Sequence, residues 1–219
     1  MTPTDFWQDI FAPCTYQAGR AEDCYVAELD DGRQIKLPVR PLPDGRNALA
    51  SLIITQASFA VQDALAERLA ALLRPYGPDV VVGLPTLGLT LAAAVARVLG
   101  HDRYVALGTS RKFWYDEALS VPLSSITTPD QSKRLYIDPR MLPLIGDRRV
   151  VLIDDVISSG TSMVAGLALM RRCGVEPVAL GCAMLQTDRW RERLAGSPTE
   201  WNGPVVGVFS TPIIDLAIE

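Results

Sequence analysis

The stretch "VVLIDDVISSGTS" at residues 150–162 constrains the fold of this chain more than any other. Its first four residues are apolar and predict a buried strand, which runs directly into Asp154 and Asp155. The small polar residues after them lead into a helix that we expect over residues 162–172. A buried strand, a short polar loop and a helix together form the repeating unit of α/β proteins, in which parallel strands alternate with helices.

The same alternation continues on both sides of this stretch. We expect further strands at residues 79–83, 103–107 and 178–185, and further helices at residues 58–74 and 89–99. Near the N-terminus, β-prone runs flank "DDGR", where Asp31 and Gly32 predict a hairpin turn with positive φ at both residues. The predicted fold class is therefore α/β, with a mostly parallel twisted sheet flanked by helices.

Composition narrows the classes of function. Of the 219 residues 48% are hydrophobic and 21% are charged, and the formal net charge of −4 gives no global field that attracts nucleic acid or an anionic membrane. The longest uncharged run, residues 80–96, is too short and too interrupted to span a membrane. Four cysteines without a CxxC pair and a single histidine indicate neither a zinc site nor a disulfide framework. We expect a cytoplasmic protein that binds neither nucleic acid nor membrane.

The loop after the aspartates has the chemistry of a sugar-phosphate site. Backbone N–H groups at a helix N-terminus favour phosphate, and a glycine lets the backbone approach it closely. Asp154 and Asp155 repel phosphate, but they can hold ribose hydroxyls or a Mg²⁺ ion that bridges to phosphates. The loop supplies one glycine and four hydroxyl groups: Ser158, Ser159, Gly160, Thr161 and Ser162.

Three loops are expected to share one crevice. Ligands of open α/β sheets bind beyond the carboxyl ends of the strands, so the loops after Gly83, Leu107 and Asp155 should meet there. The second of these loops is unusually long, because residues 108–132 show no sustained period. A stretch of this kind inside a compact domain is usually functional, and we expect it to be mobile without ligand.

Residues 150–162 resemble the phosphoribosyl-pyrophosphate (PRPP) motif of type I phosphoribosyltransferases. This motif consists, in order, of four apolar residues, two acidic residues, two apolar residues, one residue of any type and the sequence Thr-Gly-any-Thr. Ser159 and Ser162 replace threonine and keep its hydroxyl. The segment "YIDPRMLPLIGDRRVVLIDD" is similar to adenine members of the family, and "LIITQASFAVQDALAERLA" to xanthine members. A receiver-type phosphoacceptor site would also place an acidic pair after a strand, but it does not need the hydroxyl–glycine–hydroxyl run.

The resemblance implies a small hood built from the N-terminal β hairpin and the C-terminal segment. It divides the chain into a hood element at residues 1–50, a phosphoribosyltransferase core at residues 51–186 and a hood or edge segment at residues 187–219. The match is weakest in the first and last of these parts, so the resemblance assigns no base-binding residue. A homodimer is the implied assembly.

The resemblance also implies the roles of particular residues. Residues 158–162 would bind the 5′-phosphate of PRPP, and Asp154 and Asp155 would act in catalysis and hold Mg²⁺, directly or through water. Arg111 and Lys112 resemble the basic start of the mobile catalytic loop and are the other implied catalytic residues. The implied pyrophosphate loop comprises Leu84, Pro85, Thr86, Leu87 and Gly88. Leu87 stands where several members carry a basic residue, so this loop would act through its backbone.

The implied activity is the transfer of phosphoribose from PRPP to a nucleobase, with Mg²⁺-assisted release of pyrophosphate and formation of a nucleoside 5′-monophosphate. Ser158 occupies the position of an aspartate that shares a purine proton in hypoxanthine–guanine members, whereas adenine and xanthine members commonly have a small residue there. We therefore expect a purine substrate, adenine or xanthine. Orotate is the alternative base, although Leu87 replaces a lysine of the orotate enzymes. A non-catalytic regulator that binds PRPP or a nucleotide is the other alternative, which the retained Arg111 and Lys112 disfavour.

Overall fold

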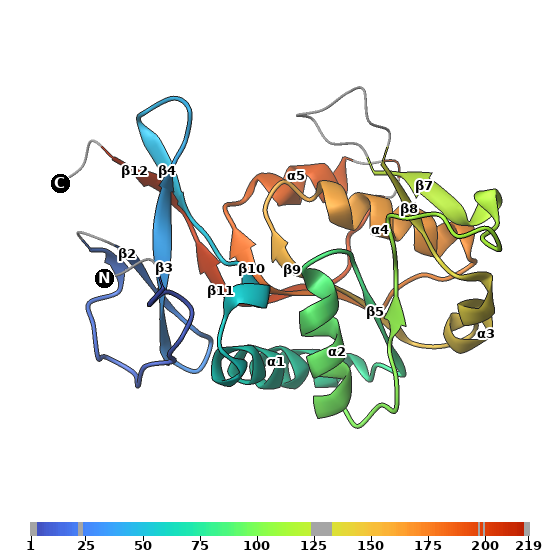
Figure 1. Ribbon diagram of the computed structural model, residues 1–219, viewed down its shortest axis with the longest axis horizontal. Helices are drawn as coiled ribbons and strands as arrows, with labels where there is room; N and C mark the ends of the chain where they lie inside the picture. The colour runs from blue at the N-terminus through green and yellow to red at the C-terminus, as the bar shows by residue number, and fades with distance from the viewer. Residues whose placement is uncertain (1–3, 22–23, 124–132, 197, 199, 217–219) are drawn as a thin grey trace.

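The computed structural model describes residues 4–21, 24–123, 133–196, 198 and 200–216. At its centre lies a parallel sheet with the strand order β11-β10-β9-β5-β6 (Figure 1). Its strands are β5 (Val80–Gly83), β6 (Val105–Ala106), β9 (Val150–Ile157), β10 (Ala179–Gln186) and β11 (Val205–Thr211). This sheet confirms the predicted α/β class.

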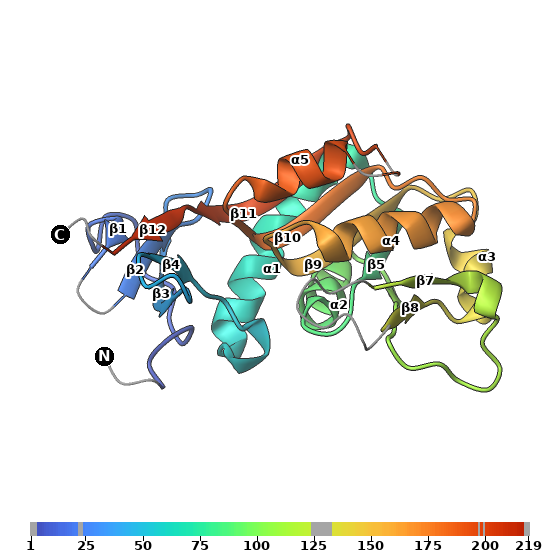
Figure 2. The ribbon, with the colours of Figure 1, turned by 90° about the horizontal axis from the view of Figure 1, so that it is seen from above.

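Helices cover both faces of the parallel sheet. The helices α1 (Phe59–Leu73) and α2 (Gly88–Val98) pack on one face, and α4 (Thr161–Arg172) and α5 (Arg189–Ala195) on the other (Figures 1 and 2). Two expected strands have bounds that differ from the prediction by two residues or more. β9 continues two residues beyond Asp155 because Ile157 still pairs with Leu185, and β6 is shorter than residues 103–107 because only two of its residues pair with β5.

The strand order places a topological switch between β5 and β9. From β5 the chain passes through α2 to β6 at one edge, and from β9 it passes through α4 to β10 and then β11 in the opposite direction. The two strands are parallel neighbours, and Gly83 lies opposite Ile153. Where neighbouring strands send the chain in opposite directions, the loops after them separate and leave a crevice at the carboxyl edge of the sheet.

A second, antiparallel sheet lies beside the carboxyl edge of the first one and forms the predicted hood (Figure 1). Its order is β1-β2-β3-β4-β12, so that the C-terminal β12 pairs with the N-terminal β4. The strands are β1 (Gly19–Arg20), β2 (Cys24–Glu28), β3 (Gln34–Pro41), β4 (Asn47–Ala50) and β12 (Ile213–Asp215). Residues 187–219 thus supply β11 to one sheet and β12 to the other.

The turn between β2 and β3 differs from the expected two-residue turn. The Leu29 N–H donates to the Arg33 carbonyl at 2.7 Å, and the Gly32 N–H donates back to the Leu29 carbonyl at 2.9 Å. Only Gly32 has positive φ, at 84°. The prediction of positive φ at Asp31 was wrong, because a longer loop needs only one residue in the left-handed region to rejoin the ladder.

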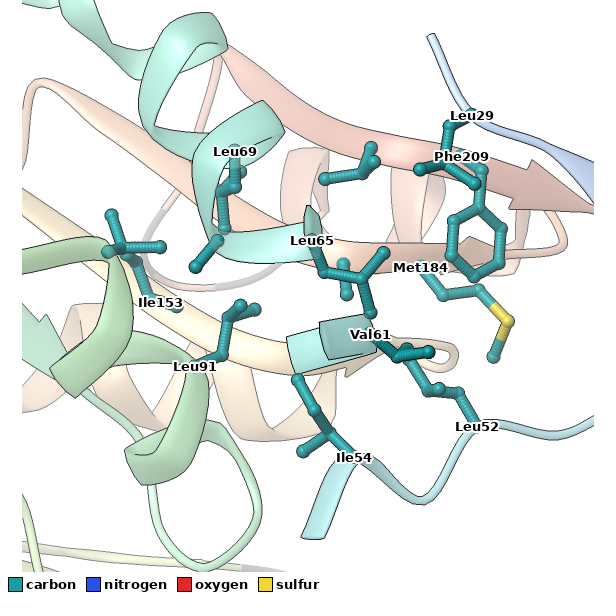
Figure 3. Packing of buried hydrophobic residues seen from close by; sticks show 14 of the residues in the cluster. Leu29, Leu52, Ile54, Val61, Leu65, Leu69, Leu91, Ile153, Met184 and Phe209 are labelled. Carbon is teal, nitrogen blue, oxygen red and sulfur yellow. The ribbon is translucent and has the colours of Figure 1, made fainter. Parts of the chain in front are cut away.

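Hood and core share one hydrophobic cluster. Ser58 caps α1 by accepting the Val61 N–H at 3.2 Å, and one stripe of this helix then faces the sheet. Leu65 of this stripe is fully buried. Figure 3 shows the stripe with Met184 and Phe209 on one side and Leu91 and Ile153 on the other. Leu29 of the hood hairpin lies next to Phe209 and belongs to the same cluster. Burial of one cluster by both sheets fixes the hood against the core.

The described part of the segment after β6 contains secondary structure that its sequence pattern does not predict. It contains a 3-10 helix at Glu117–Leu119, and the strands β7 (Ser120–Pro122) and β8 (Arg134–Tyr136) pair as an antiparallel hairpin. A short helix α3 (Leu142–Ile145) follows. Residues 124–132 of the expected mobile loop lie outside the described residues. Further 3-10 helices occur at Ile54–Gln56, Arg74–Tyr76 and Pro139–Met141.

None of the helices in the described ranges combines the length and the apolar character needed to cross a membrane.

Candidate functional site

The two aspartates lie side by side in β9, at the switch between β5 and β9. Asp154 and Asp155 are buried, with exposed fractions of 7% and 8%. The Asp155 N–H donates to Asp154 Oδ1 at 3.0 Å. Burial, and then the neighbouring Asp155 carboxylate, raise the pKa of Asp154 well above its usual range, and burial also raises the pKa of Asp155. No ion pair among the described residues engages either carboxylate. A buried acid pair of this kind is costly for the fold, which points to a role other than stability.

The loop at residues 84–88 lies directly against this acid pair. The Leu84 N–H donates to the Ile153 carbonyl of β9 at 2.8 Å, so the loop starts in register with the strand. At Gly88 an added Cβ would lie 2.6 Å from Asp154 Oδ1 and 2.8 Å from its Cα. Only glycine allows this approach, although its φ is not in the left-handed region. The peptide bond between Pro85 and Thr86 is cis.

The loop at residues 158–162 surrounds a small cavity next to Asp154. The cavity has a volume of about 100 Å³, and its lining includes Asp154 together with all five loop residues. Gly160 has a φ of 77°, and the hydroxyl groups of Ser159 and Thr161 lie 3.0 Å apart. The structure therefore brings together one predicted carboxylate and the whole predicted phosphate loop.

Both loops lead into helix N-termini whose N-cap residues provide no side-chain cap, and at α4 the Thr161 N–H makes only a long contact of 3.4 Å with Ser159 Oγ. The N-cap residues are Leu87 for α2 and Gly160 for α4, and neither side chain carries an acceptor. The first N–H groups of such helices and the helix dipole favour an anion. The crevice thus offers an anion-binding element on each side of the acid pair. Sequence reasoning predicted the loop of α4 by its chemistry, but it did not predict that α2 starts at Gly88 against Asp154.

The other two predicted catalytic residues have different partners. Arg111 forms an ion pair with Glu117 at 2.9 Å, and both side chains are more than half exposed. Lys112 is exposed, and its carbonyl accepts the Tyr115 N–H in a turn. Farther along this segment, Trp114 Nε1 donates to Asp138 at 3.2 Å, which ties the segment to the chain after β8.

Sequence reasoning missed Arg193 of α5. Its Nη2 donates to Thr161 Oγ1 at 3.3 Å, and its Cγ would lie 3.4 Å from a Cβ added at Gly160. Trp190 and Leu194 of the same helix are buried. The missed signal is the spacing, because Arg193 lies three residues after Trp190 and therefore shares its side of the helix.

The acid pair fits the requirements of Mg²⁺. This ion takes oxygen ligands and usually keeps several waters, with one or two carboxylates and substrate phosphates completing its coordination. Asp154 and Asp155 provide two such carboxylates. No cluster of three or more His, Cys, Asp or Glu side chains suited to a metal occurs in the described residues, so the part of the chain that the structure describes offers only part of a coordination shell.

Strand order and loops define an open, doubly wound α/β protein whose candidate ligand site lies at the switch between β5 and β9. The chain belongs to the phosphoribosyltransferase family, since the model of the family's phosphoribosyl transferase domain matches residues 51–208.

Individual proteins show where the similarity extends. The transcriptional regulator GfcR of Halobacterium salinarum is 31% identical over 147 residues, which are 67% of this chain and 59% of the regulator. The chain therefore spans little more than half the length of this relative. The adenine phosphoribosyltransferase of Acidiphilium cryptum is 30% identical over 133 residues, covering 58% of this chain and 71% of that enzyme. The orotate phosphoribosyltransferase of Bordetella avium is 37% identical over 75 residues, about a third of each chain, 34% and 33%.

Among solved structures, the adenine phosphoribosyltransferase of Giardia lamblia superposes with a TM-score of 0.62. The similarity covers 80% of this chain and 93% of that one at 20% identity. At this level of identity the superposition establishes the shared fold.

We predict that Gly88→Ala lowers the free energy of unfolding by about 1–3 kcal/mol, because the new methyl group must displace the loop from Asp154. Gly108→Ala is the matched control, since an added Cβ there meets nothing within 4 Å, and it should change stability by less than about 0.5 kcal/mol. Urea denaturation of both variants measures the difference. Equal effects of the two substitutions would contradict the close contact between Gly88 and β9.

We predict that Asp154→Asn raises stability near neutral pH in buffer that contains EDTA. A carboxyl group whose pKa is higher in the folded chain binds its proton more tightly when folded. Ionisation of Asp154 therefore lowers the free energy of unfolding. The native protein keeps its full stability below the pKa that Asp154 has in the unfolded chain, about 3.9, and loses stability as the pH rises from there toward the pKa of Asp154 in the folded chain. The stability of the variant relative to the native protein should accordingly increase from about pH 4 upward, as measured by denaturation at a series of pH values.

Asp138→Asn provides a control of opposite sign. Hydrogen bonds from the Arg140 guanidinium hold the pKa of Asp138 well below its usual range. Removing this carboxylate should cost stability above about pH 4, and the cost should disappear as the pH falls. The raised pKa of Asp154 would be contradicted if the stability of Asp154→Asn relative to the native protein did not change with pH. It would also be contradicted if that relative stability fell with rising pH, as expected for Asp138→Asn.

Proposed function

We propose that this protein is an enzyme that transfers phosphoribose from PRPP to a purine base, adenine or xanthine, and releases pyrophosphate. The main support is the crevice with an anion-binding helix N-terminus on each side of a buried acid pair. PRPP carries a phosphate at C5, a ribose in the middle and a pyrophosphate at C1. This order of charges matches the order of the three elements in the site.

Each element then has one task. The loop at residues 158–162 binds the 5′-phosphate, and the loop at residues 84–88 binds pyrophosphate through its backbone at the start of α2. Asp154 and Asp155 hold the ribose hydroxyls and a Mg²⁺ ion, which when bound neutralises charge on the pyrophosphate oxygens. With the carboxylates so engaged, their charge is compensated by the ligand, which explains why an acid pair is retained in a buried strand.

In the reaction, a ring nitrogen of the base forms a bond to C1 of the ribose while the bond from C1 to the pyrophosphate oxygen breaks. The electron pair of the broken bond leaves with pyrophosphate, and the base gives up a proton. The transition state resembles an oxocarbenium ion, and negative charge grows on the leaving group. Arg111 and Lys112 meet this charge when their segment closes over the crevice and excludes water.

The preference for adenine or xanthine rests on Ser158, which lines the small cavity beside the acid pair. A serine hydroxyl without an activating partner cannot take a proton from a purine near neutral pH, so a neutral 6-oxopurine would lack acid–base assistance. The similarity to an adenine phosphoribosyltransferase over 58% of this chain supports the same preference. The enzyme is proposed to work in the cytoplasm as a homodimer.

A regulator that binds PRPP or a nucleotide without turnover is the second candidate. One observation favours it: the sequence similarity to the regulator GfcR extends over more of this chain, 67%, than the sequence similarities to the Acidiphilium cryptum and Bordetella avium enzymes, 58% and 34%. Orotate transfer remains the alternative reaction, supported by similarity to an orotate enzyme over 34% of the chain.

The proposal predicts that kcat/KM is highest for adenine or xanthine among adenine, xanthine, hypoxanthine, guanine, orotate and uracil, measured at fixed PRPP and Mg²⁺. The variant with Asp154→Asn and Asp155→Asn should lose Mg²⁺-dependent PRPP binding in calorimetry while its melting temperature holds or rises. A tenfold preference for hypoxanthine or guanine, about 1.4 kcal/mol in the transition state, would contradict the role of Ser158. PRPP binding without turnover of any base would favour the regulator.

The second prediction from this mechanism concerns Arg111 and Lys112. The surface ion pair between Arg111 and Glu117 is worth at most about 1 kcal/mol, so Arg111 can leave it at little cost. Arg111→Ala with Lys112→Ala should lower kcat by about 10²-fold and weaken PRPP binding much less, because the charge that they meet develops in the transition state. Steady-state kinetics and calorimetry separate the two effects.

Glu117→Gln is the control, because it releases Arg111 without removing it and should leave kcat undiminished. Equal losses in kcat and in PRPP affinity for the double alanine variant would assign these residues to ground-state binding, and no loss would remove them from the site.

A further inference from the structure

A second, larger groove begins at the phosphate loop and runs along α4. It has a volume of about 840 Å³ and lies between α4, α5 and β7. Figures 1 and 2 both place α4 between α5 and β7. The groove shares Ser159 and Thr161 with the small cavity, but its lining does not include Asp154 or Asp155. It is therefore a separate space that touches the proposed active site at one end.

Three arginines line this groove, which we call the arginine groove: Arg172, Arg189 and Arg193. Among the described lining residues Glu192 is the single carboxylate, so their formal charges sum to three minus one, or +2, in a chain whose net charge is −4. Within the described residues, the ion pairs engage other arginines, such as Arg171 and Arg191. Charges of one sign that gather in a hollow attract a ligand of the opposite sign.

The three guanidinium groups keep most of their hydrogen-bonding capacity. Arg172 Nη1 donates to the Ser120 carbonyl at 3.0 Å, Arg193 Nη2 to Thr161 Oγ1 at 3.3 Å, and Arg189 Nε makes a long contact of 3.5 Å with Thr187 Oγ1. A guanidinium carries five N–H donors in a fork that matches phosphate, so these contacts use only a part of them. The groove can therefore bind phosphate without breaking the fold.

The floor of the groove is apolar, which restricts the class of ligand further. Val164, Ala165 and Ala168 of α4 and Val121 of β7 line it. Sites for small molecules typically have volumes of about 300–1,000 Å³, with an apolar lining and a few placed polar groups. An inorganic anion would leave this floor uncovered, whereas a nucleotide has a flat ring for the floor and phosphates for the arginines.

We propose that the arginine groove binds a nucleotide at a site distinct from the crevice. The phosphates of this nucleotide contact Arg189 and Arg193, and its base covers the floor beside Ala168. Because Arg193 also contacts Thr161 and packs against Gly160, a ligand that attracts its guanidinium changes the phosphate loop. Binding in the groove and in the crevice are thereby coupled, in both directions. The coupling rests on the proposed function, but the groove site itself does not.

The experiment titrates the full-length chain with ADP by calorimetry, in a background that carries Asp154→Asn and Asp155→Asn to weaken binding in the crevice. Arg189→Ala removes one phosphate contact, and Ala168→Leu fills the floor while it keeps every charge. We expect each to weaken ADP binding by at least about tenfold. Arg191→Ala is the matched control, because Arg191 lies on the same helix but pairs with Asp188 and stacks on Trp190 outside the groove, and it should change the affinity by less than about twofold.

Two further probes test the class of ligand. Pyrophosphate should bind more weakly than ADP but remain sensitive to Arg189→Ala, whereas adenosine should respond to Ala168→Leu alone. ADP affinity that is unchanged in both groove variants overturns the proposal. Groove variants that alter self-association in sedimentation, but not ADP affinity, also overturn it and make the groove an interface between copies of the chain.

Loss of the proposed function leaves a different pattern. If the native protein neither binds PRPP nor turns over any base, but its ADP binding responds to Arg189→Ala and Ala168→Leu and not to Arg191→Ala, the groove site stands without the enzyme.

Discussion

The close approach of the α2 N-terminus to β9 determines the geometry of the candidate site. Gly88 and Asp154 are so near that no side chain fits between them. At the other end of the same loop, the hydrogen bond from the Leu84 N–H to the Ile153 carbonyl fixes its first residue. The start of α2, the acid pair and the loop before α4 consequently keep fixed positions around one crevice. A shift of a few tenths of an ångström at Gly88 would alter the spacing between these three elements, because packed interiors have low compressibility and transmit strain.

The fold was predictable where the signal is local. The buried strand, the acid pair and the hydroxyl-rich loop are contiguous in the sequence, and the helical spacing in α1 gave that helix to within a residue at each end. The short strands β7 and β8 could not be predicted, because three residues hold neither a periodic pattern nor a turn signal. They become strands through pairing with each other, for example of Val121 with Leu135.

The same limit applies to the site. Every residue of the loop at 158–162 was predictable, because each contributes by its own chemistry. The contact of Gly88 with Asp154 joins positions far apart in the sequence, and so does that of Arg193 with Thr161; neither follows from spacing along the chain.

The acid pair also shows why the stability of the free protein does not explain every residue of the sequence. Two buried carboxylates with raised pKa values weaken the free protein, and a ligand that compensates their charge returns that stability on binding.

The passage from β11 to β12 has a mechanical consequence for the hood. The two strands belong to different sheets, yet only Pro212 separates them. A hinge absorbs motion through several freely rotating backbone angles, and proline already fixes one of the two that this single residue has. A second tie, from Gln186 Nε2 to the Ala50 carbonyl at 2.6 Å, lies beside it. The orientation of the hood is thus tied to the twist of the parallel sheet, because a rotation of β11 about its own axis turns β12 with it.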